Sequence, residues 1–136
     1  MCGFYGCIGK DKKPNKSLEH RGPNQYDSYV DEKLSLHQWR LSILDLNKQE
    51  LPWNNKNWWL LYNGEIYNYI ELKEELVKLG HTFKTTCDAE VVIESFEEWG
   101  DKAPEKFIGM WAIVLIHKQT NVILVSRDIA GKKPLF

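Results

Sequence analysis

Two helix-forming segments that follow each other directly, with strand-like segments on both sides, constrain the fold of this chain most. The first is predicted to begin at Asn68, where Glu71 can complete a capping box, and to end at Gly80. The second is predicted over 89–99, with Asp88 as its N-cap. Because the order is strands, two helices and strands again, the chain should adopt an α+β fold and not an alternating βαβ fold.

The strand predictions come from short apolar or alternating runs that are bounded by turn residues. One of these runs is expected to end in a turn at Asn63-Gly64. The run 110–117 hardly alternates, which predicts a strand that is buried on both faces. The polar stretch 9–22 contains Pro14 and is followed by Pro23, and it is predicted to be a loop. The predicted strands are 2–8, 25–30, 34–39, 57–62, 110–117 and 122–126.

Size, charge and cysteine content exclude several classes of protein. The 136 residues suit one domain, and 18 Lys and Arg against 19 Asp and Glu give no basic surplus for nucleic acid or anionic lipid. The longest apolar run, 110–116, is far shorter than the ~20 residues of a membrane helix. Cys2, Cys7 and Cys87 form neither a disulfide framework nor a metal-ligand cluster. We therefore expect a cytoplasmic protein with no metal site.

Cysteine at the second position is the clearest candidate for a catalytic residue. Removal of Met1 would leave the thiol of Cys2 and a free α-amino group on one residue. An α-amine titrates near ~7.7–8.0, so a neutral fraction can act as the base that activates the thiol. Taken alone, a cysteine here is also typical of a small residue that opens a buried strand.

Four further motifs accompany Cys2 in a fixed order, and together they carry a resemblance to a known family. The chain resembles the class II glutamine amidotransferases of the N-terminal-nucleophile hydrolase superfamily. It is most similar to the glutaminase domain of glutamine-dependent asparagine synthetases, and the resemblance covers the whole chain. The motifs are His-Arg-Gly-Pro at 20–23, Arg-Leu-Ser-Ile-Leu-Asp at 40–45, Asn-Gly-Glu-Ile-Tyr-Asn-Tyr at 63–69 and Asp-Ala-Glu-Val-Val at 88–92.

The resemblance implies a single glutamine amidotransferase type 2 domain over 1–136. Its fold would be a four-layer αββα arrangement with two facing antiparallel sheets. Family members continue with further strands and a synthetase domain that uses ATP and Mg²⁺, so we expect this domain to be incomplete after Phe136 and to bind no cofactor itself. An apolar edge left without those strands would associate with a partner or with a second copy.

The resemblance also implies a role for each candidate catalytic residue. The Cys2 thiolate would attack the glutamine side-chain amide and form a thioester, with its own α-amine relaying the proton. The Asn63 side-chain amide and the Gly64 backbone N–H would form the oxyanion hole, where one donor is typically worth ~2.7–4 kcal/mol. Taken alone, Asn63-Gly64 is more typical of a plain turn.

The other implied site residues would bind the amino-acid end of glutamine. Arg40 would hold the α-carboxylate, for which its planar fork of donors is well matched, and Leu41 and Ile43 would contact the substrate beside it. Glu65 and Asp88 would meet the α-ammonium. From the residues alone, Arg40 is more typical of a surface ion pair, and Asp88 is more typical of a helix N-cap, than of a ligand-binding residue.

The expected function is therefore hydrolysis of glutamine to glutamate and ammonia for an asparagine-synthetase-like amidation of aspartate. The expected partners are glutamine and a synthetase domain or subunit, with no nucleic acid and no membrane. Two alternatives stay open. The ammonia could serve another acceptor, such as a sugar phosphate, or the chain could be a silent fragment that binds glutamine or a partner without turnover.

Overall fold

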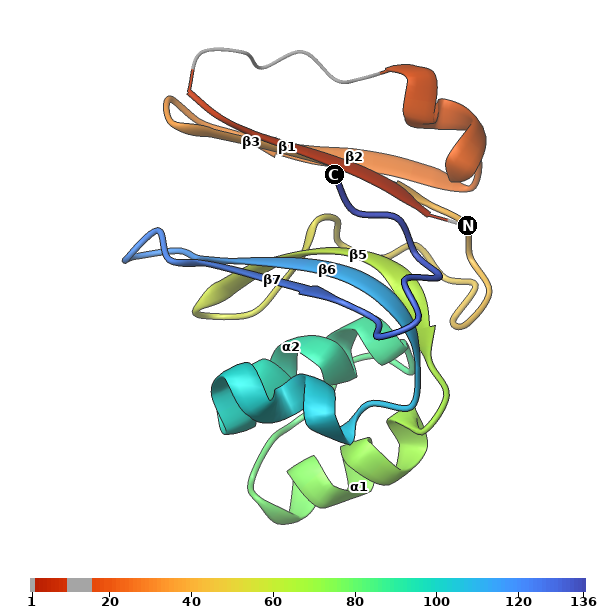
Figure 1. Cartoon of the computed structure of the whole chain (residues 1–136), viewed down its shortest axis with the longest axis vertical. Helices are drawn as coiled ribbons and strands as arrows, with labels where there is room; N and C mark the ends of the chain where they lie inside the picture. Colours follow the sequence, from red (N-terminus) through yellow and green to blue (C-terminus); the bar gives the residue numbers. More distant parts are fainter. Residues whose placement is uncertain (1, 10–15) are drawn as a thin grey trace.

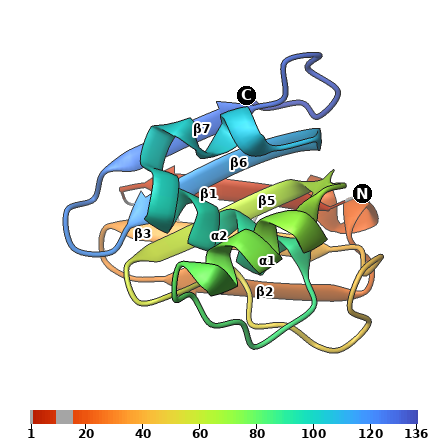
Figure 2. The same ribbon diagram turned by 90° about the horizontal axis from the view of Figure 1, so that it is seen from below.

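Two antiparallel sheets lie face to face, and two helices cover the outer face of one of them (Figures 1 and 2). The computed structural model describes residues 2–9 and 16–136. Met1 and the stretch 10–15, on which the predicted methionine removal and much of the predicted loop fall, lie outside the described residues. The three-stranded sheet has the order β1 (Gly3–Ile8), β3 (Leu34–Arg40), β2 (Gln25–Val30). The four-stranded sheet has the order β4 (Trp53–Asn54), β5 (Trp58–Ile66), β6 (Gly109–His117), β7 (Ile123–Arg127).

The helices form one complete outer layer. Helices α1 (Tyr69–Lys78) and α2 (Asp88–Trp99) pack on the four-stranded sheet, and the 3₁₀ segment η2 (Gly100–Lys106) follows α2 directly. On the outer side of the three-stranded sheet lies a shorter 3₁₀ segment, η1 (Lys16–Arg21). The α+β class and the facing antiparallel sheets confirm the prediction, whereas η1 corrects the expectation of a loop without regular structure throughout 9–22.

Strands β5 and β6 are buried on both faces because each lies between two layers. Trp111, Ile113 and Leu115 of β6 pack toward the helices, whereas Val114 and Ile116 pack toward the three-stranded sheet. The same alternation places Leu60 and Tyr62 of β5 in the helix-side core and Leu61 in the core between the sheets. This explains the nearly continuous apolar sequence of β6, since both faces of the strand need apolar side chains.

The predicted turn at Asn63-Gly64 is wrong. Both residues lie inside β5, where Asn63 pairs with Ala112 and Gly64 pairs with Trp111 of β6. The dipeptide is typical of hairpin turns, but the flanking apolar residues pair with β6 over nine consecutive positions. Strand pairing thus prevails over the local turn preference.

Both predicted helix caps also differ from the structure. Asn68 stands at the N-cap position of α1, but its side chain bonds outside the helix, accepting from Ile108 N–H and donating to the Lys106 carbonyl. The N-cap of α2 is Cys87, and Asp88 is the first helical residue. The N-terminal turn of α2 is instead tied by Glu90, whose carboxylate accepts from the backbone N–H groups of the preceding loop. The side chain of Asp88 is therefore available for contacts elsewhere.

Gln38 fixes the two sheets relative to each other. This fully buried side chain of β3 donates to the Tyr62 carbonyl at 3.0 Å and accepts from the Tyr62 N–H at 3.1 Å. A longer hydrogen bond of 3.3 Å joins the same amide to the carbonyl of Gly3. A buried amide that is satisfied in this way holds the start of β1 beside the middle of β5. Cys2 directly precedes Gly3, and Asn63 directly follows Tyr62, so the same amide also brings Cys2 and Asn63 near each other.

The remaining surface has two features that bear on location and assembly. Within 2–9 and 16–136, no helix combines the length and the apolar character that a membrane span needs. Strand β7 lies at the edge of its sheet, with Ile123 and Val125 41% and 62% exposed. The expected association through this edge stays a prediction.

Candidate functional site

All eight residues proposed from the sequence line one pocket of about 110 Å³. The pocket lies where β1 begins, β3 ends and β5 continues toward the helices. Its walls include Cys2, Arg40, Leu41, Ile43, Asn63, Gly64, Glu65 and Asp88. The structure thus brings together residues from four separate parts of the chain. Their individual roles stay predictions.

Cys2 contacts the backbone of the segment that follows β3. The Leu41 N–H donates to Cys2 Sγ over 3.4 Å, and the thiol lies 3.8 Å from the Leu41 carbonyl oxygen. Burial raises the pKa of the Cys2 thiol, while the Leu41 N–H and the charge of Arg40 act in the opposite direction. The thiol therefore needs a base to become a nucleophile, and the Leu41 N–H can stabilise the thiolate once it forms.

Arg40 organises the loop behind the nucleophile. Its side chain is buried, and Nη1 donates to the Asn47 carbonyl at 3.0 Å. Nη2 donates to the carbonyl oxygens of Leu44 and Asp45. Three of the five guanidinium donors thus bond to carbonyl oxygens of this loop, and the other two have no hydrogen-bond acceptor among the described residues. These bonds show that Arg40 is not the surface ion pair that its residue type alone would suggest.

The segment before β2 supports the same loop. Gly22 passes so close to β3 that an added Cβ would lie 2.3 Å from the Trp39 carbonyl carbon. Pro23 forms an isolated bridge with Arg40, and the Asn24 side chain accepts from the Ser42 N–H at 2.9 Å. The His-Arg-Gly-Pro motif therefore packs against the end of β3, and only Gly could occupy its closest point. None of its four residues lines the pocket, so its role as a wall of the site stays a prediction.

Asn63 and Gly64 lie on β5 at the floor of the pocket. Asn63 is 5% exposed, and an added Cβ at Gly64 would lie 2.5 Å from the Met110 carbonyl oxygen and 2.9 Å from the Trp111 Cα. Glycine is required here because β6 approaches closely, and not because of a turn. The geometry leaves an amide side chain and a bare glycine backbone side by side in the pocket.

Asp88 is buried at the start of α2 and belongs to a hydrogen-bonded group. The Tyr62 hydroxyl donates to its Oδ2 at 2.6 Å, and the Ile66 N–H donates to the same atom at 3.0 Å. Burial raises the pKa of the Asp88 carboxyl, although these donors and Cys87 favour the charged form. Oδ2 accepts both of these short hydrogen bonds, whereas Oδ1 lies 3.7 Å from the Cys87 sulfur, so Oδ1 has more capacity to accept from a ligand.

Several pocket residues escaped the sequence reasoning. They occur in ordinary strand, loop or turn patterns, and no local signal separates them from structural residues. Cys87 is a second buried thiol in the pocket, but burial, followed by the neighbouring Asp88, raises its pKa to about 12. It therefore stays a thiol at neutral pH and cannot replace Cys2 as the nucleophile. The residues that were missed are Leu44, Trp53, Tyr62, Cys87, Met110 and Lys133.

The site shows no arrangement for a metal ion. In the part of the chain that the structure describes, no group of three or more His, Cys, Asp or Glu side chains is placed to hold one. The residues described here therefore do not fit a Mg²⁺ site, and no step proposed below passes through Mg²⁺ or ATP.

Comparison of the whole chain with known proteins gives a consistent result. The family model described as "Glutamine amidotransferase domain" matches residues 1–136. The glutamine-hydrolysing asparagine synthetases 1 and 2 of Bacillus subtilis (strain 168) are 37% and 40% identical to the chain over 150 residues. These matches cover 100% of this chain but 24% and 20% of those proteins. The glutamine-hydrolysing asparagine synthetase of Zea mays is 33% identical over 148 residues, with 100% and 25% covered. The chain thus spans about a quarter of the length of these relatives.

A solved structure supports the fold. It is the glutamine phosphoribosylpyrophosphate amidotransferase of Bacillus subtilis, determined in complex with ADP and GMP. It matches with a TM-score of 0.58 and 23% sequence identity, covering 75% of this chain and 24% of that one. The match confirms the predicted N-terminal-nucleophile hydrolase fold.

Proposed function

Because this chain belongs to the glutamine amidotransferase domain family, we propose that it hydrolyses glutamine to glutamate and ammonia. The observation that carries the proposal is the single pocket in which Cys2, Asn63, Gly64, Arg40 and Asp88 meet. A nucleophile, two oxyanion donors, a cation and a carboxylate are the groups that hydrolysis of an amino-acid amide requires.

The reaction would begin at the sulfur of Cys2. After Met1 is removed, the Cys2 α-amine takes the thiol proton, and the thiolate attacks the side-chain carbonyl carbon of glutamine. The carbonyl oxygen becomes an oxyanion, to which Asn63 and Gly64 donate. Collapse of this intermediate breaks the C–N bond, and the proton from the α-amine goes to the leaving ammonia. Water then attacks the thioester, which releases glutamate and restores the Cys2 thiol.

The amino-acid end of glutamine would be held on the opposite side of the pocket. The two unused donors of Arg40 suit the α-carboxylate, and Oδ1 of Asp88 suits the α-ammonium, with Glu65 nearby. The loop segment with Leu41 and Ile43 lines the space between. This arrangement would select an α-amino acid because both of its charged groups are matched.

We further propose that the ammonia serves amidation of aspartate in a synthetase portion of the protein or of a partner. The support is the set of relatives, which are named as glutamine-hydrolysing asparagine synthetases and are about four times as long. ATP and Mg²⁺ would act in that portion. A cytoplasmic location stays part of the proposal.

The test is replacement of the nucleophile in protein whose N-terminal residue has been checked by mass spectrometry. Cys2→Ala should lower the rate of glutamate release at least about 10³-fold, because Cys2 is the pocket thiol that carries the α-amine on its own residue. Cys7→Ala is the matched control and should keep the activity. A chain that retains Met1 should also be inactive, since the Cys2 nitrogen is then an amide. Equal activity of the wild type and Cys2→Ala would overturn the proposal.

A further inference from the structure

Lys133 is a cation of the pocket that the proposed reaction has not yet used. It is 5% exposed and lines the same pocket as Cys2. Among the described residues, its ammonium group has no hydrogen-bond acceptor, ion-pair partner or aromatic ring. A cation that lines a pocket and has no partner among the described residues can meet a negatively charged group of a ligand there.

The backbone around Lys133 is held rigidly. Its N–H donates to Asp128 Oδ2 at 3.0 Å, and its carbonyl accepts from Arg127 Nε at 2.8 Å. The same Asp128 oxygen accepts from the Trp111 N–H at 3.2 Å. Because Trp111 pairs with Gly64, these bonds place Lys133 at the Asn63–Gly64 end of the pocket.

The two cations of the pocket therefore differ in position and in how many hydrogen bonds their side chains already donate within the protein. Arg40 lies at the end of β3 and already donates to three carbonyl oxygens of its own loop. Lys133 lies in the segment after β7, and its ammonium donates to none of the described residues. If glutamine binds with its α-carboxylate at Arg40, its side-chain amide is the part that reaches Lys133.

The charge at that end of the substrate changes during the proposed reaction. The glutamine side chain is neutral when it binds, carries an oxyanion in each tetrahedral intermediate, and ends as the γ-carboxylate of glutamate. A cation at this position stabilises the later species but gains little from the neutral amide.

We propose that Lys133 is a further catalytic residue, whose ammonium binds the negative charge that forms on the side-chain oxygen of the substrate. This inference rests on the proposed glutaminase function. It predicts that Lys133 promotes turnover, contributes little to glutamine binding and strengthens the binding of glutamate.

The kinetic test compares Lys133→Met with Lys132→Met, which removes the neighbouring but exposed ammonium. Lys133→Met should lower kcat about 10- to 100-fold with KM for glutamine changed less than about threefold. Lys133→Arg should recover part of the loss, and Lys132→Met should match the wild type. An unchanged kcat in folded Lys133→Met, or an effect on KM alone, would overturn the proposal.

A binding test separates this inference from the glutaminase proposal. In a Cys2→Ala background, calorimetry should show that Lys133→Met weakens glutamate binding about 10- to 100-fold and leaves glutamine binding unchanged. Thermal unfolding of the same sample shows that the variant is folded, and Lys133→Arg provides a second variant. Equal losses for both ligands would contradict the assignment. Failure of the glutaminase proposal would appear differently, as a wild type that releases no glutamate.

Discussion

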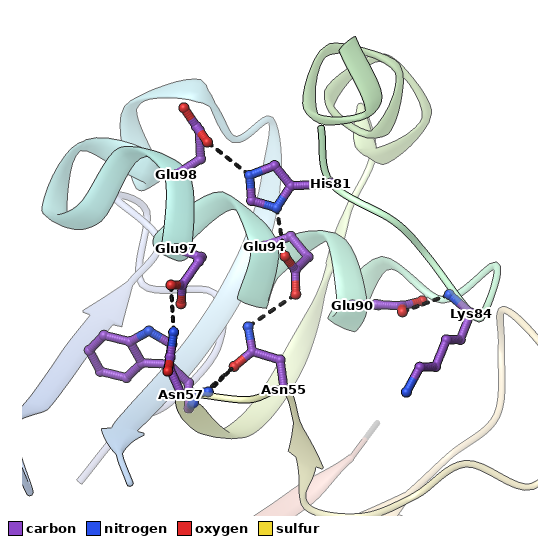
Figure 3. Close-up of polar contacts among 9 residues, drawn as sticks. Asn55, Asn57, His81, Lys84, Glu90, Glu94, Glu97 and Glu98 are labelled. Carbon is purple, nitrogen blue, oxygen red and sulfur yellow. Dashed lines mark hydrogen bonds and ion pairs between the residues drawn. The ribbon is translucent and has the colours of Figure 1, made fainter. Parts of the chain in front are cut away.

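Two polar clusters contact helix α2, and they differ in whether their charged groups are paired with other groups of the protein. The His81 cluster, on the outer side of α2, consists of His81, Asn55, Asn57, Glu94, Glu97 and Glu98 (Figure 3). His81 lies between two carboxylates, with Nδ1 2.6 Å from Glu94 and Nε2 2.8 Å from Glu98. At the other end of α2, the Cys2 pocket contains a buried thiol, a buried aspartate and a lysine whose ammonium has no partner among the described residues.

The difference shows which cluster is structural. In the His81 cluster each charged group has a protein partner, since Asn55 donates to Glu94 at 3.0 Å and Asn57 donates to Glu97 at 2.7 Å. These bonds tie the β4–β5 connection and the α1–α2 loop to α2 (Figure 3). The pocket instead keeps donors and acceptors open, at a cost in stability that only a bound ligand offsets. Similar residue types thus serve the fold in one place and a ligand in the other.

The largest expected effect is a loss of kcat from a substitution in the Cys2 pocket, with no such loss from a matched substitution in the His81 cluster. Asn63→Ala should lower kcat for glutamine hydrolysis by about 10²–10³-fold, because one oxyanion donor is lost. Asn57→Ala removes an asparagine from the His81 cluster and is the matched control. It should leave kcat unchanged. Steady-state kinetics on both variants checks the comparison, and similar losses in the two would refute it.

The second prediction concerns the group that holds Asp88. Tyr62→Phe removes the 2.6 Å hydrogen bond to the buried carboxylate and should lower the free energy of unfolding by roughly 1.5–3 kcal/mol. KM for glutamine should rise as well, because Asp88 then loses its fixed position. Tyr67→Phe, at a residue 57% exposed, is the control that should change neither quantity. Denaturant unfolding and kinetics together would detect the effect, and an unchanged KM would separate Asp88 from substrate binding.

The smallest effect concerns the His81 cluster and depends on pH. Burial lowers the pKa of His81, but the hydrogen bonds to Glu98 and Glu94 outweigh burial and raise the pKa above its usual value. Because the folded pKa lies above the unfolded value of about 6.5, the stabilisation is fully present below that pH and is lost as the pH rises through the folded pKa.

His81→Gln should therefore cost roughly 1 kcal/mol of unfolding free energy at pH 5.5 and clearly less at pH 9. Urea unfolding of the variant and the wild type at both pH values measures this. Activity at pH 8 should be unchanged, since the cluster is separate from the pocket. A cost that grows with pH would show that protonated His81 does not stabilise the fold.

The secondary structure could be predicted from the sequence because its signals are local. Helices α1 and α2 follow the spacing of their apolar residues, and β6 follows a run that needs apolar neighbours on both faces. The short strand β4 (Trp53–Asn54) and the 3₁₀ segments η1 and η2 were missed, because two to seven residues carry too little periodicity. The eight candidate site residues came from motifs in a fixed order, which is also information within the sequence.

The tertiary structure alone decided which partners particular residues contact. Asn63-Gly64 has the composition of a turn but lies within β5, because pairing with β6 outweighs the preference of two residues. Asp88 has the composition of a helix cap but bonds to Tyr62 and Ile66, since the fold brings β5 beside its helix. Nothing near Lys133 in the sequence indicates that it lines a pocket with Cys2. Periodicity and motifs depend on neighbours along the chain, whereas burial and hydrogen bonding depend on neighbours in space.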